Sequence, residues 1–144
     1  MVIPDVNVLV AAFMSGHPHH EVAQTWLHQS LADEAQIVVV PDLVWVGFIQ
    51  VITNKRIFEH PASIEAAAGF VIAVTQRPTY DDYSGLTGGI DQLLRLCDQA
   101  QMVGGQVLDA YIAVVAMQLG ATVATFDNDF RRHRKLKVID LNKR

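Results

Sequence analysis

Residues 108–127 read LDAYIAVVAMQLGATVATFD and place a helix pattern directly before a strand pattern. The first twelve residues carry apolar side chains at helical spacing, and Gly120 stands where a helix-ending glycine is favoured. Residues 121–126 form an apolar run typical of a buried strand, and Asp127 follows it. The stretch therefore predicts a helix packed on a strand, with a carboxylate at the carboxyl end of that strand.

The same alternation of strand and helix patterns extends over the rest of the chain. We expect strands at 2–4, 37–40, 121–126 and 138–141, and helices at 6–13, 21–35, 42–54, 62–75, 90–101 and 108–119. Residues 76–89, with Pro78 and two consecutive glycines, predict a loop. This order predicts an α/β fold, a three-layer sandwich with a parallel central sheet. A length of 144 residues with 51% hydrophobic side chains suits a single domain over 1–144.

The net charge of −4 is unevenly distributed along the chain. Residues 127–144 hold seven basic and three acidic side chains, whereas the first 126 residues hold four basic and twelve acidic ones. This pattern indicates either an acidic site beside a phosphate-binding basic edge or an ordinary solvated C-terminal surface. The sequence contains no apolar stretch long enough to span a membrane and no export signal, so we expect a cytoplasmic protein.

Three aspartates occupy positions that the expected fold brings together. Asp5 and Asp127 each follow a strand, and Asp109 lies near the start of an apolar helix. Ligands bind outside the carboxyl ends of parallel strands, and clustered carboxylates repel one another unless they bind a cation. Mg²⁺ or Mn²⁺ would resolve that repulsion and support phosphodiester hydrolysis. Each aspartate also has a structural interpretation, because aspartate is favoured at helix N-caps.

Six segments, in this order and at this spacing, resemble the PIN-domain family, and more narrowly its VapC toxins of mycobacterial type. The segments are DVNVL (5–9), HPHH (17–20), PDLVW (41–45), TNKRIF (53–58), DAY (109–111) and TFDNDF (125–130). The resemblance covers nearly the whole chain. It implies a ribonuclease that depends on Mg²⁺ or Mn²⁺, forms a homodimer, cuts structured RNA such as tRNA, and is inactivated by a VapB-type antitoxin.

The resemblance also implies roles for individual residues. Asp5, Asp109 and Asp127 match the family's first, third and fourth acids, which bind the metal. Asp129 matches an auxiliary catalytic acid, or it caps the short helix through Phe130. Two polar residues, Asn7 and Thr125, match positions that orient the carboxylates, although Asn7 also suits a local hydrogen bond at the start of its helix.

The chain departs from the family at the second acid. Trp45 stands where most members have a glutamate, and the nearby Asp42 either substitutes for it or caps the helix. The departure motivates a second hypothesis, a catalytically impaired PIN domain that binds RNA or antitoxin without cutting. A third hypothesis, an aspartyl-phosphate phosphotransferase, is disfavoured because Asn7 stands where that chemistry would want a second aspartate. The histidines at 17, 19 and 20 are interpreted as loop and helix-start residues, since a zinc site would need further ligands.

Overall fold

A five-stranded, fully parallel sheet forms the centre of the molecule. The computed structural model describes residues 1–86, 88–133 and 135–143, and for Arg131 and Arg132 it describes the backbone alone. The strands are β1 (Val2–Pro4), β2 (Val38–Pro41), β3 (Tyr80–Tyr83), β4 (Thr122–Thr125) and β5 (Lys137–Asp140). Their spatial order is β3-β2-β1-β4-β5, so β1 lies at the centre.

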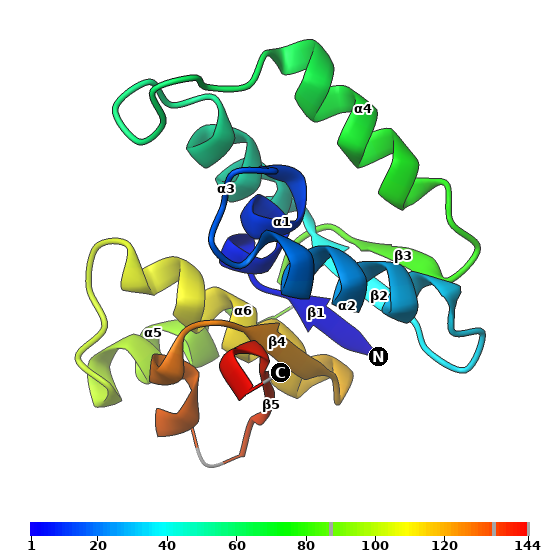
Figure 1. Ribbon diagram of the computed structural model, residues 1–144. Coiled ribbons are helices and arrows are strands. Elements are labelled where there is room, and N and C mark those ends of the chain that lie inside the picture. The colour runs from blue at the N-terminus through cyan, green and yellow to red at the C-terminus, as the bar shows by residue number, and fades with distance from the viewer. Residues whose placement is uncertain (87, 134, 144) are drawn as a thin grey trace.

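Helices cover both faces of the sheet, as Figure 1 shows. One face carries α1 (Val6–Phe13), α2 (His20–Ala32), α3 (Asp42–Ile52) and α4 (Ile64–Thr75), and the other carries α5 (Ile90–Gln99) and α6 (Gln106–Leu119). The chain moves outward from β1 to β3 and then returns to β4. Because parallel crossovers are right-handed, this reversal sends the last two helices to the opposite face. The expected three-layer α/β sandwich is confirmed.

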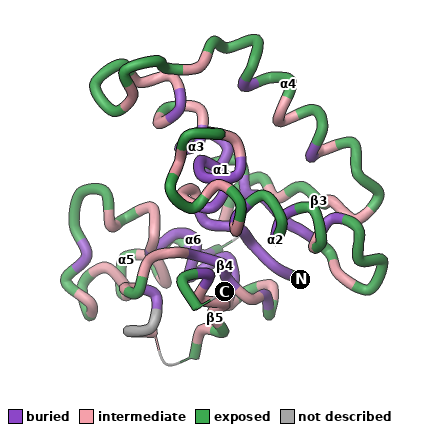
Figure 2. Tube along the Cα trace, viewed as in Figure 1, coloured by how far each residue is buried: buried purple, intermediate pink, exposed green. Residues whose placement is uncertain are grey.

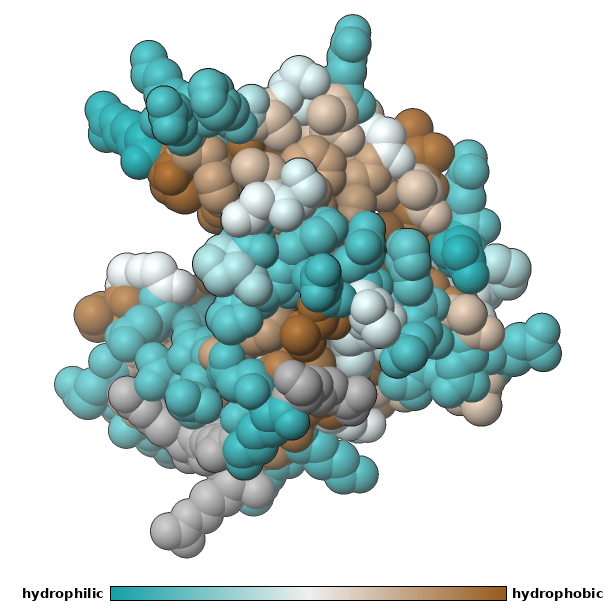
Figure 3. Space-filling view, in the orientation of Figure 1, coloured by the Kyte–Doolittle hydropathy of each residue, from teal (hydrophilic) through white to brown (hydrophobic). Residues whose placement is uncertain are grey.

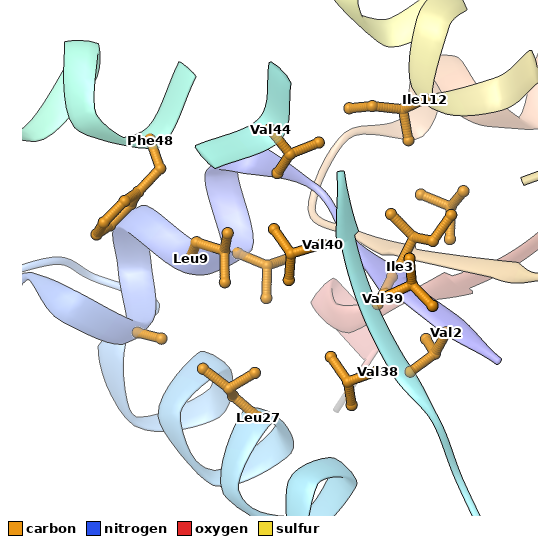
Figure 4. Close-up of a cluster of buried hydrophobic side chains, with 14 of the residues drawn as sticks. Val2, Ile3, Leu9, Leu27, Val38, Val39, Val40, Val44, Phe48 and Ile112 are labelled. Carbon is orange, nitrogen blue, oxygen red and sulfur yellow. The ribbon is translucent and has the colours of Figure 1, made fainter. Parts of the chain in front are cut away.

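The core is built from the valines of β2 and the apolar faces of the helices. Side chains alternate across a strand, so Val38 and Val40 point toward α1 and α2 while Val39 points to the opposite face (Figure 4). All three are at most 2% exposed, and burying such a side chain is worth roughly 1.5–3 kcal/mol. Figure 2 shows this burial concentrated in the central strands, α1 and α6, whereas α4 is largely exposed. Of α4, which is described throughout, only Ala67 and Val74 are buried.

The strand β3 corrects the loop predicted for residues 76–89. Its sequence, YDDY, is polar and has no buried residue, yet it pairs in parallel with all four residues of β2. It occupies an edge of the sheet, where backbone hydrogen bonds to one neighbour are enough and side chains face solvent. Sequence patterns that rely on apolar alternation miss such a strand.

Helix α6 ends as predicted. Gly120 has φ 64°, a left-handed conformation that other residues adopt only with strain, and its N–H bonds back to the last turn. This turn delivers the chain directly into β4. Within the described ranges, none of the helices is long and apolar enough to cross a membrane.

Candidate active site

The three predicted metal-binding aspartates line one pocket at the carboxyl edge of the sheet. Asp5 follows β1 and Asp127 comes two residues after β4, the neighbouring strand, while Asp109 projects from the first turn of α6. The pocket has a volume of about 330 Å³, and Asn7 and His17 also line it. Its residues come from both sides of a hollow that Figure 3 shows between the α3–α4 part and the α5–α6 part of the surface. The three aspartates therefore meet at this edge of the sheet, as the sequence predicted.

A hydrogen-bond network centred on Thr125 fixes two of these acids. Thr125 Oγ1 donates to Asp5 Oδ2 at 2.7 Å and accepts from the backbone N–H of Asp127 at 2.9 Å. Asn7 Nδ2 donates to the same hydroxyl at 3.4 Å, and Asn7 Oδ1 accepts from the N–H of Phe126 at 3.3 Å. Thr125 is 1% exposed and Asp5 is 4% exposed, so these bonds form away from solvent. The orienting roles predicted for Asn7 and Thr125 match this geometry.

The carboxylates destabilise one another's charge. Burial raises the pKa of Asp5 to about 6, against the lowering effect of the bonds from Thr125 and Val6, and the nearby Asp127 raises it further. Burial also raises the pKa of Asp109 to about 7, with added repulsion from Asp5, Asp127 and Asp129. A bound cation would relieve this repulsion.

Two of the acids also cap helices, so the structural interpretation holds beside the functional one. Asp5 is the N-cap of α1 and accepts from the N–H of Val6 at 2.7 Å. Asp127 is the N-cap of the 3₁₀ helix η1 (Asn128–Arg132) and accepts from the N–H of Asp129 at 2.9 Å. Asp129 is therefore not the cap of that helix. Asp109 is no cap either, since Gly105 is the N-cap of α6.

The acids are not assembled into a finished metal site. Across residues 1–86, 88–133 and 135–143, no three or more His, Cys, Asp or Glu side chains form a group that could hold an ion. Hydrogen bonds to Thr125, Val6 and Asp129 direct the carboxylates of Asp5 and Asp127 toward protein donors. A metal ion would have to draw the side chains closer together.

Helix α3 contributes no carboxylate to the acidic pocket. Trp45 is buried and turned the other way, with its Nε1 donating to Tyr80 Oη at 3.1 Å. Gly47 is the residue of α3 that faces the side of the acidic pocket, because a Cβ there would lie 3.0 Å from Val6, which lines the pocket, and 3.2 Å from Leu108. Asp42 is the first residue of α3, after an N-cap at Pro41, and lines a different pocket with Leu43 and Tyr111. The N-cap role predicted for Asp42 is wrong, and its place in that other pocket does not support substitution for the second acid.

The basic C-terminal residues are divided between the two edges of the sheet. Lys137 begins β5 beside Thr122, the first residue of β4, and therefore lies at the amino edge, opposite the acids. Lys143 lies in the 3₁₀ helix η2 (Leu141–Lys143), beyond the carboxyl end of β5. Arg134 and Arg144 are outside the described residues. The charge pattern suggested a continuous basic edge beside the acids, and the position of Lys137 at the other edge of the sheet does not support it.

Two loops reach the acidic pocket that the sequence did not assign to it. His17, from the loop after α1, and Ile57 and Phe58, from the loop after α3, line it together with the aspartates. Both loops carry segments of the family resemblance, HPHH and TNKRIF, but their spacing gave no sign that they meet. His17 has a lowered pKa, because burial and the neighbouring His19 and His20 disfavour its charged form.

The fold and the site together define a class, an α/β domain with an acidic pocket at the carboxyl edge of a parallel sheet. The PIN domain model matches residues 2–136. The chain is 35% identical over 139 residues to Ribonuclease VapC25 of Mycobacterium tuberculosis, covering 96% of this chain and 97% of that protein. It is 31% identical to Ribonuclease VapC43 of the same organism over 95% of this chain and 92% of that one.

Solved structures show the same fold at lower identity. VapC20 of Mycobacterium tuberculosis, described as a toxin that cleaves the sarcin-ricin loop, superposes with a TM-score of 0.71 at 15% identity, over 92% of this chain and 94% of that one. VapBC2 from Rickettsia felis, bound to promoter DNA, superposes with a TM-score of 0.67 at 18% identity, over 97% and 98%. The chain belongs to the PIN-domain family and, within it, to the VapC ribonucleases. Nucleases with this domain depend on a metal ion.

Proposed function

We propose that this chain is the toxin of a VapBC-type toxin–antitoxin pair, an endoribonuclease that uses Mg²⁺ to cut structured RNA, with tRNA as the substrate class, in the cytoplasm. The observation that carries the proposal is the convergence of Asp5, Asp109 and Asp127 from three separate elements on one pocket. Full-length similarity to ribonucleases supports the reaction class. We treat residues 1–144 as one nuclease domain.

Asp5, Asp109 and Asp127 are the proposed metal-binding residues. Their chemistry fits a hard divalent ion, because Mg²⁺ and Mn²⁺ prefer oxygen ligands, and a cation would offset the burial and the mutual repulsion that raise the pKa values of Asp5 and Asp109. When bound, the ion would supply an activated water and neutralise charge on the cut phosphate. Mn²⁺ is expected to replace Mg²⁺, since both favour the same ligands.

The chain's own residues prepare the site for this chemistry. Thr125 holds Asp5 in place through its hydroxyl, and the same hydroxyl fixes the backbone at Asp127. Asp129 lies close enough to raise the pKa of Asp109, and we assign it the auxiliary catalytic role. Hydrolysis by water would leave a 5′-phosphate and a 3′-hydroxyl, without use of the ribose 2′-hydroxyl.

Exposed apolar side chains on α3 and on α4 support a protein partner that would cover them. Val46 of α3 is 49% exposed and Ile72 of α4 is 51% exposed, and Figure 3 shows apolar atoms gathered on the part of the surface that carries α4. Large exposed apolar patches mark interaction sites. We assign this surface to a VapB-type antitoxin, which would also place a cationic side chain among the carboxylates.

A second apolar surface supports a homodimer. Leu43, Ile90 and Leu94 are 47%, 60% and 63% exposed, and the first two line a hollow of about 490 Å³ between α3 and α5. A second copy of the chain would cover this surface. Ile90→Glu should then yield a monomer in light scattering, whereas the wild-type chain should scatter as a dimer.

The decisive experiment incubates purified protein, free of antitoxin, with total bacterial RNA in Mg²⁺, Mn²⁺ or EDTA, and maps the new 5′ ends by sequencing. Asp5→Ala and Asp109→Asn should abolish cutting, and the exposed His28→Ala on α2 serves as the control. Discrete cuts in tRNA that need the metal and both aspartates are the expected result. Intact RNA under every condition would reject the nuclease.

A second candidate, an RNA- or antitoxin-binding domain that does not cut, is favoured by one observation. The described helix α3 brings no carboxylate to the acidic pocket, so a bound metal would have one carboxylate ligand fewer than the family resemblance implies. Calorimetric titration with Mn²⁺ separates the candidates. Weak binding together with intact RNA and retained RNA affinity would favour the binding domain.

A further inference from the structure

Two loops without an assigned role meet beside the acidic pocket. His17 and Phe58 line that pocket and also line a second hollow of about 300 Å³. The remaining walls of the second hollow are Met14, Gly16, Pro18, Glu59 and His60. The two hollows therefore adjoin, with His17 and Phe58 at their common boundary.

The first loop, between α1 and α2, contacts the residue that follows β4 through two stacked rings. The ring of His19 stacks on Phe126, which directly precedes Asp127, with centroids 4.4 Å apart and planes within 13°. The N–H of His19 donates to His17 Nδ1 at 3.0 Å, so the neutral ring of His17 carries its proton on Nε2. His20 Nδ1 lies 2.9 Å from the carbonyl oxygen of Ala11, which ties the end of the loop to α1. His17 is thus held as a hydrogen-bond donor at the edge of the acidic pocket.

The second loop is folded by Asn54. Its side-chain oxygen accepts from the N–H of Arg56 at 2.9 Å, and its carbonyl accepts from Ile57 at 3.0 Å and from Phe58 at 3.1 Å. This turn holds Phe58 half-buried against the pocket and leaves Lys55 and Arg56 exposed. One short segment therefore carries an aromatic residue that lines both hollows and two exposed cations.

We propose that the second hollow is a subsite for the RNA base next to the cut phosphate, with the base stacked on Phe58. The inference rests on the proposed ribonuclease function and adds a substrate-binding element to it. Unpaired RNA bases bind proteins by stacking on aromatic side chains, while basic groups hold the backbone. Lys55 and Arg56, exposed on the same loop, would contact the neighbouring phosphates. His17 donates from Nε2 to the nucleotide that spans the two hollows.

The composition of the hollow favours a base over the other ligands of an acidic nuclease. Met14, Pro18 and Phe58 give it apolar walls, which suit a planar ring and do not suit a hydrated ion. Glu59 and His60 provide polar groups at its rim that can distinguish bases by their hydrogen-bonding edges. The subsite therefore predicts a preference for particular bases at one position beside the cut.

Binding of mononucleotides tests the subsite without relying on catalysis. Each of the four ribonucleoside 3′-monophosphates would be titrated, in EDTA, into the ¹⁵N-labelled full chain, with amide shifts followed by NMR. We expect the largest shifts at residues 14–20 and 54–60, with different affinities for different bases. Phe58→Leu should weaken the tightest complex by roughly fivefold or more, whereas Phe58→Tyr, which keeps the ring, should retain it.

Phe70→Leu is the matched control, because Phe70 is a half-buried ring that packs on Phe13 and Phe48, in the aromatic cluster of the α1, α3 and α4 face. The same variants would be compared in the mapping of cut RNA. The subsite predicts that Phe58→Leu loses the base preference beside the cut, while Phe70→Leu keeps it. Thermal unfolding of each variant confirms that the fold is retained.

The outcomes separate this inference from the proposed function. Equal nucleotide affinity in the wild type and Phe58→Leu, with unchanged cut positions, would overturn the subsite while leaving the ribonuclease intact. Shifts at the two loops that Phe58→Leu removes, in a protein that cuts no RNA, would support the subsite and reject the ribonuclease.

Discussion

Replacing Asp5 by asparagine should stabilise the metal-free protein at pH 8 and abolish its ribonuclease activity. Burial raises the pKa of Asp5 from 3.8 to about 6, so the ionised side chain destabilises the folded state. At ~1.4 kcal/mol for each pKa unit, this penalty is about 3 kcal/mol. Asparagine has no charge, but its hydrogen bonds to Val6 and Thr125 are weaker, by about 1 kcal/mol. The expected net gain is about 1–2 kcal/mol.

The pH dependence of this gain has a definite sign. A carboxyl group whose pKa is raised by folding favours the folded state most when it is protonated, and that contribution is lost as pH rises from 3.8 through 6. At pH 3.5–4 the wild-type side chain is neutral in the folded state and about half protonated in the unfolded state, so asparagine brings little gain there. Repulsion from Asp127 is already part of the raised pKa of Asp5, whereas the repulsion that Asp5 exerts on Asp109 is lost in the variant and adds to the gain at pH 8.

The measurement is urea unfolding of both proteins in EDTA at pH 8 and at pH 3.5–4. Asp98→Asn, an exposed position on α5, is the matched control and should change the free energy of unfolding by less than about 0.5 kcal/mol at either pH. A loss of stability in Asp5→Asn that is equal at both pH values would refute the reasoning, because it would mean that the aspartate acts as a cap and not as a buried charge.

Three further substitutions test other parts of the site. Thr125→Val keeps the shape of the side chain but removes the hydroxyl that donates to Asp5. Metal-dependent RNA cutting should fall about tenfold or more, and NMR titration should show a higher pKa for Asp5. An unchanged cutting rate and an unchanged pKa would show that Thr125 does not orient the carboxylate. Trp45→Phe should lower the free energy of unfolding by about 1 kcal/mol, because the hydrogen bond to Tyr80 is lost. RNA cutting should stay at the wild-type rate. A large loss of cutting would place Trp45 in the active site. Gly47→Leu should destabilise the fold by about 1–3 kcal/mol, since even a Cβ would lie 3.0 Å from a side chain of α1 and 3.2 Å from one of α6; an undiminished melting temperature would contradict this packing.

The elements that the sequence predicted are those whose burial leaves a strong pattern. The helix-to-strand unit at 106–125 was predicted to within two residues at each end, because its core-facing residues repeat regularly and Gly120 marks its turn. The edge strand β3 was missed because one of its sides faces solvent and not another strand. Its sequence is therefore polar and shows no alternation of apolar and polar residues. Apolar periodicity reports burial, and an edge strand has little of it.

The acidic part of the site could be predicted because strand ends in a parallel sheet share one edge. Asp5 and Asp127 needed only the assignment of β1 and β4 as parallel strands. The direction in which Trp45 points depends on the rotation of α3 about its axis. The meeting of His17 with Phe58 depends on the paths of two loops. The spacing of residues in the sequence specifies neither. Those contacts came only from the structure.

The bond between Thr125 and Asp5 joins residues 120 positions apart, and this separation affects how the protein is made. A chain still being translated has its first acid long before it has the threonine that orients it or the aspartates at 109 and 127. A product that ends before residue 125 therefore lacks the site. A ribosome that makes this enzyme is not exposed to its activity until the last fifth of the chain has emerged and folded onto the first strand.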